Sequence, residues 1–175
     1  MKSDYQTSIK HRGYYTWEEL KDTPGVPTEE RMDEGAVAVI ECTQEIPCDP
    51  CETSCPFDAV KIGEAITNLP RLLEEKCTGC GTCLPECPGL AIFKVTKNYS
   101  ESTSLVEFPY EYLPLPEKGE IVQCVNRKGE AITEGKIIKV DNKAKNDRTP
   151  VVAVEIPKAY CQEVRSILYT GRNDK

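Results

Sequence analysis

The sequence predicts an α+β protein. A pseudo-twofold module built on two cysteine runs comes first, and a small antiparallel β-rich domain with a C-terminal helix follows it. Three observations lead to this fold class. Eight of the ten cysteines fall within residues 42–87. Each cysteine run is flanked by short β-prone stretches. Beyond residue 104, short β-prone segments alternate with turn-forming residues, which is typical of a small barrel or sheet.

Residues 1–35 are polar, are interrupted by proline and glycine, and predict an extended N-terminal arm without a core of its own. Within this arm, Thr16 and Glu19 fit a capping box that would begin one helical turn. Its large apolar side chains, Tyr14, Tyr15 and Trp17, are expected either to pack on the protein's own core or to contact a partner.

Residues 36–97 read as an internal repeat. Each half is expected to run from a β-prone lead-in through a cysteine run to Cys-Pro, one short helical turn and a short strand. The first lead-in is 36–41, and the last strand is 93–95. Proline suits the first position of a helical turn, where its missing N–H costs little.

The spacing of the cysteines carries the chemistry. The second run reads C-x2-C-x2-C-x3-C-P over Cys77, Cys80, Cys83, Cys87 and Pro88, and this pattern is typical of ligands to a [4Fe–4S] cluster. The first run has three extra residues after its first cysteine and reads C-x5-C-x2-C-x3-C-P over Cys42, Cys48, Cys51, Cys55 and Pro56. Thiolates are soft anionic ligands that iron–sulfur cores require. The sequence therefore predicts two [4Fe–4S] clusters.

In such runs the fourth cysteine binds the other cluster, so the predicted ligand sets are crossed. The first cluster is expected to take Cys42, Cys48, Cys51 and Cys87, and the second Cys55, Cys77, Cys80 and Cys83. Cys42 is separated from the rest by a longer gap, and if it does not reach the cluster, the first site would be [3Fe–4S]. Zinc is the competing metal, because paired C-x2-C groups also bind zinc.

Residues 98–104 form a polar link that predicts a domain boundary, and 105–175 predict a β-rich docking domain. Strands are expected at 105–108, 120–125, 131–133, 136–140 and 151–156, with Gly135 breaking the run between the third and fourth. Pro157 is expected to open a last helix with one apolar face, made by Tyr160, Cys161, Val164, Ile167 and Leu168. Cys124 and Cys161 stand alone and are expected to be small buried apolar residues.

The formal net charge of −7 becomes about −11 when each of two clusters with its thiolates adds −2. This charge and a pI near 4.9 oppose nucleic-acid binding and favour partners with basic docking patches. The N-terminus has no signal-like apolar core, and the apolar run 36–40 is far too short to cross a membrane. A cytoplasmic protein with reduced, metal-binding thiols is therefore expected.

Residues 36–95, about a third of the chain, resemble the two-cluster bacterial ferredoxins, with both Cys-Pro ends present. The whole chain is similar to small iron–sulfur subunits of FAD-dependent dehydrogenases of the amino-acid or dye-linked proline type. The features that carry this similarity are Ile40-Glu41-Cys42, residues 46–51 and the appended β-rich region. This resemblance implies a hetero-oligomer in which a flavoprotein dehydrogenase subunit holds the FAD or FMN. The present chain would pass electrons between that flavin and another carrier.

The function expected from these observations is electron transfer within a multi-subunit oxidoreductase, and a free-standing ferredoxin shuttle is the alternative. A catalytic role is not expected. Eight cysteines can close both sites, which leaves no iron open to substrate, and no acid–base constellation accompanies them.

Overall fold

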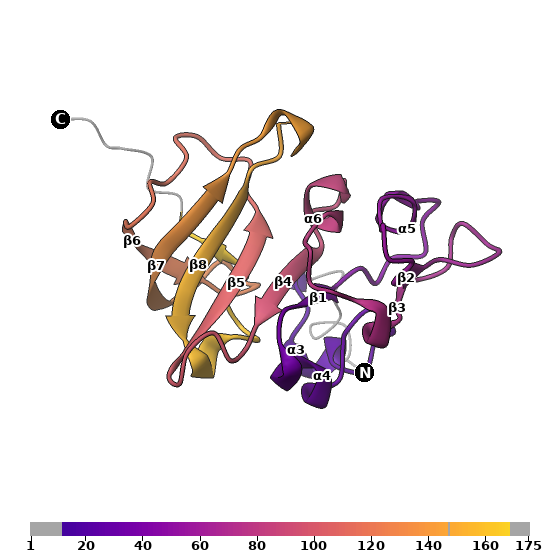
Figure 1. The fold of residues 1–175 in the computed structure, drawn as a ribbon, viewed down its shortest axis with the longest axis horizontal. Helices are drawn as coiled ribbons and strands as arrows, with labels where there is room; N and C mark the ends of the chain where they lie inside the picture. Colours follow the sequence, from indigo (N-terminus) through magenta and orange to yellow (C-terminus); the bar gives the residue numbers. More distant parts are fainter. Residues whose placement is uncertain (1–11, 147, 169–175) are drawn as a thin grey trace.

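The computed structural model of the chain describes residues 12–146 and 148–168. These residues form a mixed, strand-rich fold with few and short helices (Figure 1). The strands are Val37–Ile40 (β1), Val60–Lys61 (β2), Arg71–Leu72 (β3), Ile92–Thr96 (β4), Thr103–Pro109 (β5), Ile121–Val125 (β6), Ala131–Asp141 (β7), Val151–Pro157 (β8) and Ser166–Ile167 (β9). Seven of them form one antiparallel sheet in the order β1-β4-β5-β8-β7-β6-β9, and β2 pairs with β3.

The strands of the cysteine-rich half pair across its internal repeat. β1, which leads into the first cysteine run, pairs with β4, which leaves the second run. β2, which leaves the first run, pairs with β3, which leads into the second. Each half thus exchanges strands with the other, as a pseudo-twofold repeat predicts, and this exchange brings the two cysteine runs side by side.

Two short helices lie inside the cysteine runs rather than after them. They are α5, Pro50–Thr53, and α6, Cys83–Glu86, and they contact each other. The helical turns predicted after each Cys-Pro pair are wrong, because the chain makes a single hydrogen-bonded turn there. The reason is the same in both halves: Asp58 and Leu90, each three residues after the fourth cysteine, adopt positive φ angles of 57° and 51°. This left-handed conformation ends a right-handed helix.

The N-terminal segment folds against the cysteine-rich half (Figure 1). Its first helix, α3 at Trp17–Leu20, has the predicted Thr16–Glu19 capping box, and its second, α4 at Glu29–Glu34, is capped by Thr28. Leu20 and Met32 are fully buried, so this segment contributes to the core rather than extending from it. Residues 1–11 of the predicted arm lie outside the described residues.

The stretch predicted as a domain boundary is the turn between β4 and β5. Lys94 in β4 pairs with Glu107 in β5, and the hydroxyl of Ser104 donates to the carbonyl of Lys97 at 2.6 Å. The large sheet therefore continues directly from β4 to β5 across the predicted boundary. The division into a domain of 36–97 and a domain of 105–175 stays a prediction.

The strands predicted in the β-rich half are present, with one difference at Gly135. The two strands expected at 131–133 and 136–140 are one continuous strand, β7. A Cβ at Gly135 would lie 2.5 Å from Cγ1 of Val154 and 2.6 Å from Sγ of Cys124. Glycine is therefore needed here for close packing beneath the sheet, and it does not break the strand.

The C-terminal helix predicted from Pro157 onward is wrong. A short 3-10 turn at Lys158–Tyr160 is followed by turns and then by β9, whose residues pair with β6. The apolar positions at Cys161, Val164 and Ile167 are buried as expected, but they line the sheet core from an irregular segment. Backbone bonds from Arg165 N to Val125 O and from Leu168 N to Gln123 O hold this segment extended along the sheet edge.

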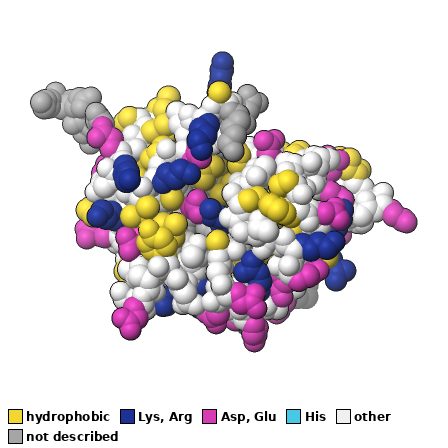
Figure 2. Space-filling view, viewed as in Figure 1, with side chains coloured by type: hydrophobic (Ala, Val, Ile, Leu, Met, Phe, Trp, Pro, Cys, Tyr) yellow, Lys and Arg dark blue, Asp and Glu magenta, His cyan; other side chains and the backbone are white. Residues whose placement is uncertain are grey.

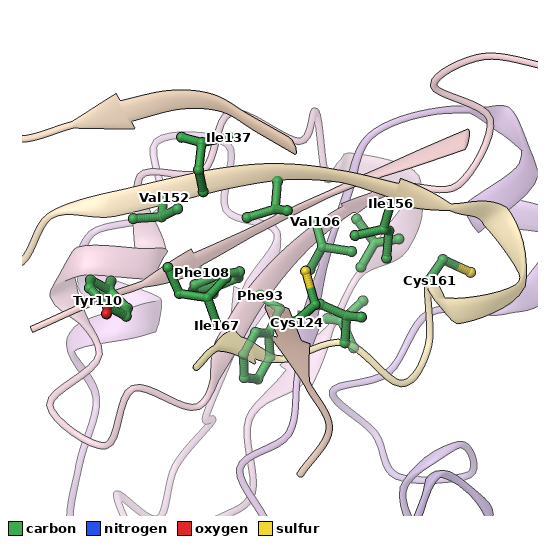
Figure 3. Close-up of a cluster of buried hydrophobic side chains, with 14 residues drawn as sticks. Phe93, Val106, Phe108, Tyr110, Cys124, Ile137, Val152, Ile156, Cys161 and Ile167 are labelled. Atoms are coloured by element: carbon green, nitrogen blue, oxygen red, sulfur yellow. The ribbon is translucent and has the colours of Figure 1, made fainter. Parts of the chain in front are cut away.

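A single apolar core fills the β-rich half (Figure 3). Cys124 and Cys161 lie in this core, which confirms that they are small buried residues. The core also reaches Val39 of β1 and Phe93 of β4, so the sheet packs continuously from the cysteine-rich half into the β-rich half. A second core, which includes Met32, Ile40 and Leu84, lies beside the cysteines.

Candidate metal centres

Two cavities in the cysteine-rich half are each lined by four cysteines, and each draws its cysteines from both runs. Cys42, Cys48, Cys51 and Cys87 line the first cavity. Cys55, Cys77, Cys80 and Cys83 line the second. In each case three cysteines come from one run and the fourth from the other, which is the grouping that the crossed ligand assignment predicts.

The two cavities are similar in size, about 360 Å³ at the second site and about 380 Å³ at the first, with the space open to solvent included. Each cavity offers four soft sulfur donors, so the two suit the same kind of metal centre. Within residues 12–146 and 148–168, no three His, Cys, Asp or Glu side chains converge tightly enough to bind a single metal ion. A [4Fe–4S] cube takes one thiolate at each of four irons, so its ligands surround a volume instead of a point.

The fourth cysteine of each run accepts an equivalent backbone hydrogen bond. Ala59 N donates to Sγ of Cys55 at 3.3 Å, and Ala91 N donates to Sγ of Cys87 at 3.4 Å. The donor is four residues after the cysteine in both halves. The positive φ of the residue in between turns this amide back toward the sulfur. Hydrogen bonds of this kind stabilise a thiolate ligand and raise the reduction potential of the metal centre it binds.

Without metal, most of the clustered cysteines whose pKa is shifted are held in their protonated form. Burial raises the pKa of Cys83 to about 12, and the nearby Cys77, Cys80 and Cys55 add to this shift. Burial likewise raises the pKa of Cys51 to about 11, with Cys87 and Cys48 nearby. These electrostatic neighbours are the same crossed sets that line the cavities. Binding of a metal centre would have to displace these protons.

Cys80 differs from the other cysteines in both exposure and protonation. It is the one exposed cysteine among the described residues. Burial raises its pKa, but hydrogen bonds from Thr82 and Thr78 outweigh burial and hold the pKa below its ordinary value. The Thr82 hydroxyl lies 3.5 Å from Sγ of Cys80. The second site therefore has a polar, solvent-facing corner.

The loop of the second run depends on close contacts with Ala36, just before β1, and with Arg31 of α4. Gly79 has φ of 66°, and a Cβ there would lie 2.5 Å from the carbonyl oxygen of Ala36. Arg31, from α4, donates to the carbonyl of Cys77 at 2.6 Å and to that of Ala36 at 3.1 Å. Sequence reasoning missed Arg31, because nothing in its local pattern separates it from an ordinary exposed helix residue.

Lys94 is a second site residue that the sequence did not reveal. It lies in β4 and is the one charged side chain among the described residues that line the second cavity. Its ammonium pairs with Glu107 at 2.5 Å, and both side chains are largely buried. It also lines an open cleft that lies beside Cys80 and extends to Asp141 and Ala153 of the β-rich half.

Comparison with known proteins supports iron–sulfur binding by this part of the chain. The family model of the LdpA Fe–S cluster-binding domain matches residues 41–98, which contain all eight clustered cysteines. These residues have the features of an iron–sulfur, ferredoxin-like family. Iron–sulfur cluster binding is thus supported by the family match and by the donor set of the two cavities.

The chain is also similar to parts of larger proteins. One is a subunit of the Na(+)-translocating ferredoxin:NAD(+) oxidoreductase complex of Acetobacterium woodii, 53% identical over 38 residues, which are 22% of this chain and 11% of that protein. Another is a subunit of the ion-translocating oxidoreductase complex of Methanosarcina acetivorans, 38% identical over 60 residues, 34% of this chain and 20% of that protein. Protein Pixie of Drosophila melanogaster is 30% identical over 100 residues, 50% of this chain and 15% of that protein.

The matched segment thus spans only between about a tenth and a fifth of the length of these curated relatives. No solved structure matches the chain significantly. Among the helices of residues 12–146 and 148–168, none is both long and apolar enough to cross a membrane.

Proposed function

We propose that this chain is an electron-transfer subunit of a multi-subunit, flavin-dependent oxidoreductase and that it carries two [4Fe–4S] clusters. The ligands are Cys42, Cys48, Cys51 and Cys87 at the first site and Cys55, Cys77, Cys80 and Cys83 at the second. One observation carries the proposal: two cavities of similar volume are each lined by four cysteines in the crossed grouping. When bound, the clusters accept and donate single electrons. The protein supplies their ligands, spacing and polarity.

The proposed partner is a flavoprotein dehydrogenase subunit that holds FAD or FMN, in a cytoplasmic hetero-oligomer. Two of the similar proteins are named as subunits of oxidoreductase complexes, which supports a role within a complex. The N-terminal segment and the β-rich half, both outside the family match at 41–98, supply surface for docking. Figure 2 shows lysine and arginine side chains over the β7–β8 side of one face, and charges of both signs over the cysteine-rich half.

A free-standing ferredoxin shuttle is the second candidate, because it would use the same clusters and differ only in the lifetime of its complexes. Anaerobic purification from the native host separates the two. We expect co-purification with a flavoprotein and a size-exclusion mass well above 19.6 kDa. A lone monomer would favour the shuttle.

Cluster content is tested on the same preparation. Two filled sites predict about eight irons per chain, a brown chromophore that dithionite bleaches, and EPR signals of reduced [4Fe–4S] centres. A colourless protein with bound zinc would overturn the proposal. So would protein with iron that does not change oxidation state.

A further inference from the structure

The two cysteine-lined cavities differ in charge. The non-cysteine lining of the first consists of neutral residues: Ile40, Gln44, Ile46, Ile62, Asn68, Pro70, Pro88 and Ile92. The second has apolar residues (Ala38, Pro56, Phe57, Ala59 and Val60), threonine and glycine residues around its cysteines, and one charged residue, Lys94. Both walls are therefore mainly apolar, and the difference between them is one cation, Lys94, at the second site.

The Lys94 side chain lies against the loop of the second cysteine run. Its Nζ is 3.7 Å from the position that a Cβ at Gly81 would occupy, and Gly81 lies between Cys80 and Cys83. Glu107 holds this ammonium from the neighbouring strand at 2.5 Å. The side chains of Lys94 and Glu107 are only 17% and 12% exposed, so water screens their charges weakly.

Arg31, which donates to the carbonyl of Cys77, has the same sign as Lys94 but does not line the cavity, and two further groups of charges do not offset this difference. Glu41, beside Cys42, pairs with Arg127 and Arg165. Side chains alternate between the two faces of a strand, so Glu41 points to the face of Val39 and away from Ile40, which lines the first cavity. None of these three charged residues lines either cavity.

Asp58, Lys61 and Lys76 form an ion-paired group near the second run, at the surface. Their side chains are between 37% and 64% exposed. Solvent and salt therefore screen their charges from the second site.

We propose that the site of Cys55, Cys77, Cys80 and Cys83 holds an electron more strongly than the site of Cys42, Cys48, Cys51 and Cys87, and that Lys94 is the positioning residue that sets this bias. The proposal rests on the proposed function, because it requires a [4Fe–4S] centre at both sites. Reduction changes such a centre with its four thiolates from −2 to −3. A nearby buried ammonium stabilises the added charge, and a wall without a charged group does not.

The bias concerns one electron shared by the two sites. When the electron leaves the first site, that site is oxidised from −3 to −2, and the second is reduced from −2 to −3, so charge and electrons balance. The favoured site contains Cys80, the exposed cysteine, which also lines the open cleft shared with the β-rich half. The electron thus rests at the site that faces solvent, where a redox partner can approach.

The test is a redox titration of the anaerobic, cluster-loaded full chain with dithionite, followed by EPR. Spectra of Cys48→Ser and Cys80→Ser assign each signal to its site. Lys94→Gln is expected to lower the potential of the second site, with about a tenfold change in the electron-sharing constant, which corresponds to about 59 mV. Glu107→Gln leaves the ammonium uncompensated and is expected to move the same potential upward.

Lys97→Gln is the matched control. Lys97 is also a largely buried, ion-paired lysine at the end of β4, but its partners are Glu29 and Asp33, and it lines neither cavity. Its loss should leave both potentials unchanged. Lys94→Arg keeps the charge and should keep the wild-type potential.

The outcomes separate this inference from the proposed function. Iron content well below about eight, or iron that is not reducible, overturns the proposed function itself. A second outcome is that both sites load and reduce fully. If the potential of the second site then does not fall in Lys94→Gln and rise in Glu107→Gln, only the role of Lys94 is overturned. If Lys94→Gln does not fold, the upward shift in Glu107→Gln still decides the question.

Discussion

Arg165 donates from Nε to Oε1 of Glu41 at 2.6 Å, and this bond joins positions that are 124 residues apart. Arg127 binds the same carboxylate through both Nε and Nη2, at 2.9 and 2.7 Å. All three side chains are less than a tenth exposed. The Arg165 guanidinium also lies 5.0 Å from the centre of the Phe93 ring. A buried charge network therefore fixes the C-terminal segment and the β6–β7 turn onto the end of β1.

Replacement of Glu41 by Gln should destabilise the protein strongly. Two buried guanidinium groups would lose their counter-charge, and removal of one partner from a buried network costs about 3–5 kcal/mol. Chemical denaturation followed by fluorescence of Trp17 measures this loss. Trp17 is the single tryptophan, and its ring lies 5.8 Å from the Arg127 guanidinium carbon.

Glu163→Gln is the control for this measurement. Glu163 also faces Arg127, but at 3.7 Å and with a side chain that is 46% exposed. A surface ion pair of this kind contributes roughly 0–1 kcal/mol. Equal losses in the two variants would contradict the central role of Glu41.

Gly135→Ala should destabilise the β-rich half by about 1–3 kcal/mol, because overpacking forces neighbouring groups to move. The new methyl group would meet Cys124 Sγ at 2.6 Å and Val154 Cγ1 at 2.5 Å. Unfolding free energies of Gly135→Ala, Cys124→Ala and the double variant form a cycle that isolates the clash. The double variant should be more stable than the sum of the single effects predicts. Strict additivity would show that Cys124 does not make the contact.

The same glycine illustrates what sequence can and cannot predict here. The low strand propensity of glycine predicts that Gly135 breaks the strand. Its actual role depends on Cys124 and Val154, which lie next to it only after the sheet has formed. The predicted strands were recognisable because their apolar, β-branched residues carry a local signal. The two cysteine groups were recognisable because their spacing reflects direct contact with one small object.

The C-terminal error has a similar origin. The spacing of Cys161, Val164 and Ile167 fits one helical face, and all three are buried, but periodicity cannot show that β6 offers a free edge beside them. Arg165 would have faced solvent on such a helix, and it is instead buried against Glu41. Long-range partners of this kind, like those of Arg31 and Lys94, leave no trace in the local sequence.

Cys124 should remain unreactive in the folded protein at alkaline pH. Burial raises the pKa of its thiol to about 12, so it stays protonated where an ordinary thiol, with a pKa of about 8.5, ionises. Iodoacetamide at pH 9 should modify Cys124 only after denaturation, as mass spectrometry of the peptide would show. Rapid modification of the native protein would contradict its burial.

The same shift predicts a pH dependence of stability. Since the folded-state pKa is raised, the contribution of Cys124 is fully present below about pH 8.5. It is lost as the pH rises toward about 12, because only the unfolded chain releases the proton. Between pH 8 and 10 the unfolding free energy of wild type should fall more steeply than that of Cys124→Ala. Parallel slopes would contradict this.

Cys42→Ser tests the least regular position of the proposed ligand sets. Five residues separate Cys42 from Cys48, yet Cys42 lines the same cavity as Cys48, Cys51 and Cys87. The folded chain therefore closes the gap, and burial together with the nearby Cys87 and Cys42 raises the pKa of Cys48. Loss of this thiolate should leave three sulfur ligands at the first site. We expect iron to fall from about eight toward seven per chain, and an EPR signal of an oxidised [3Fe–4S] centre to appear.

Cys124→Ser, which changes a cysteine outside both cavities, should keep full iron and both reduced signals. If Cys42→Ser did the same, the first site would need a different fourth ligand beside Cys48, Cys51 and Cys87.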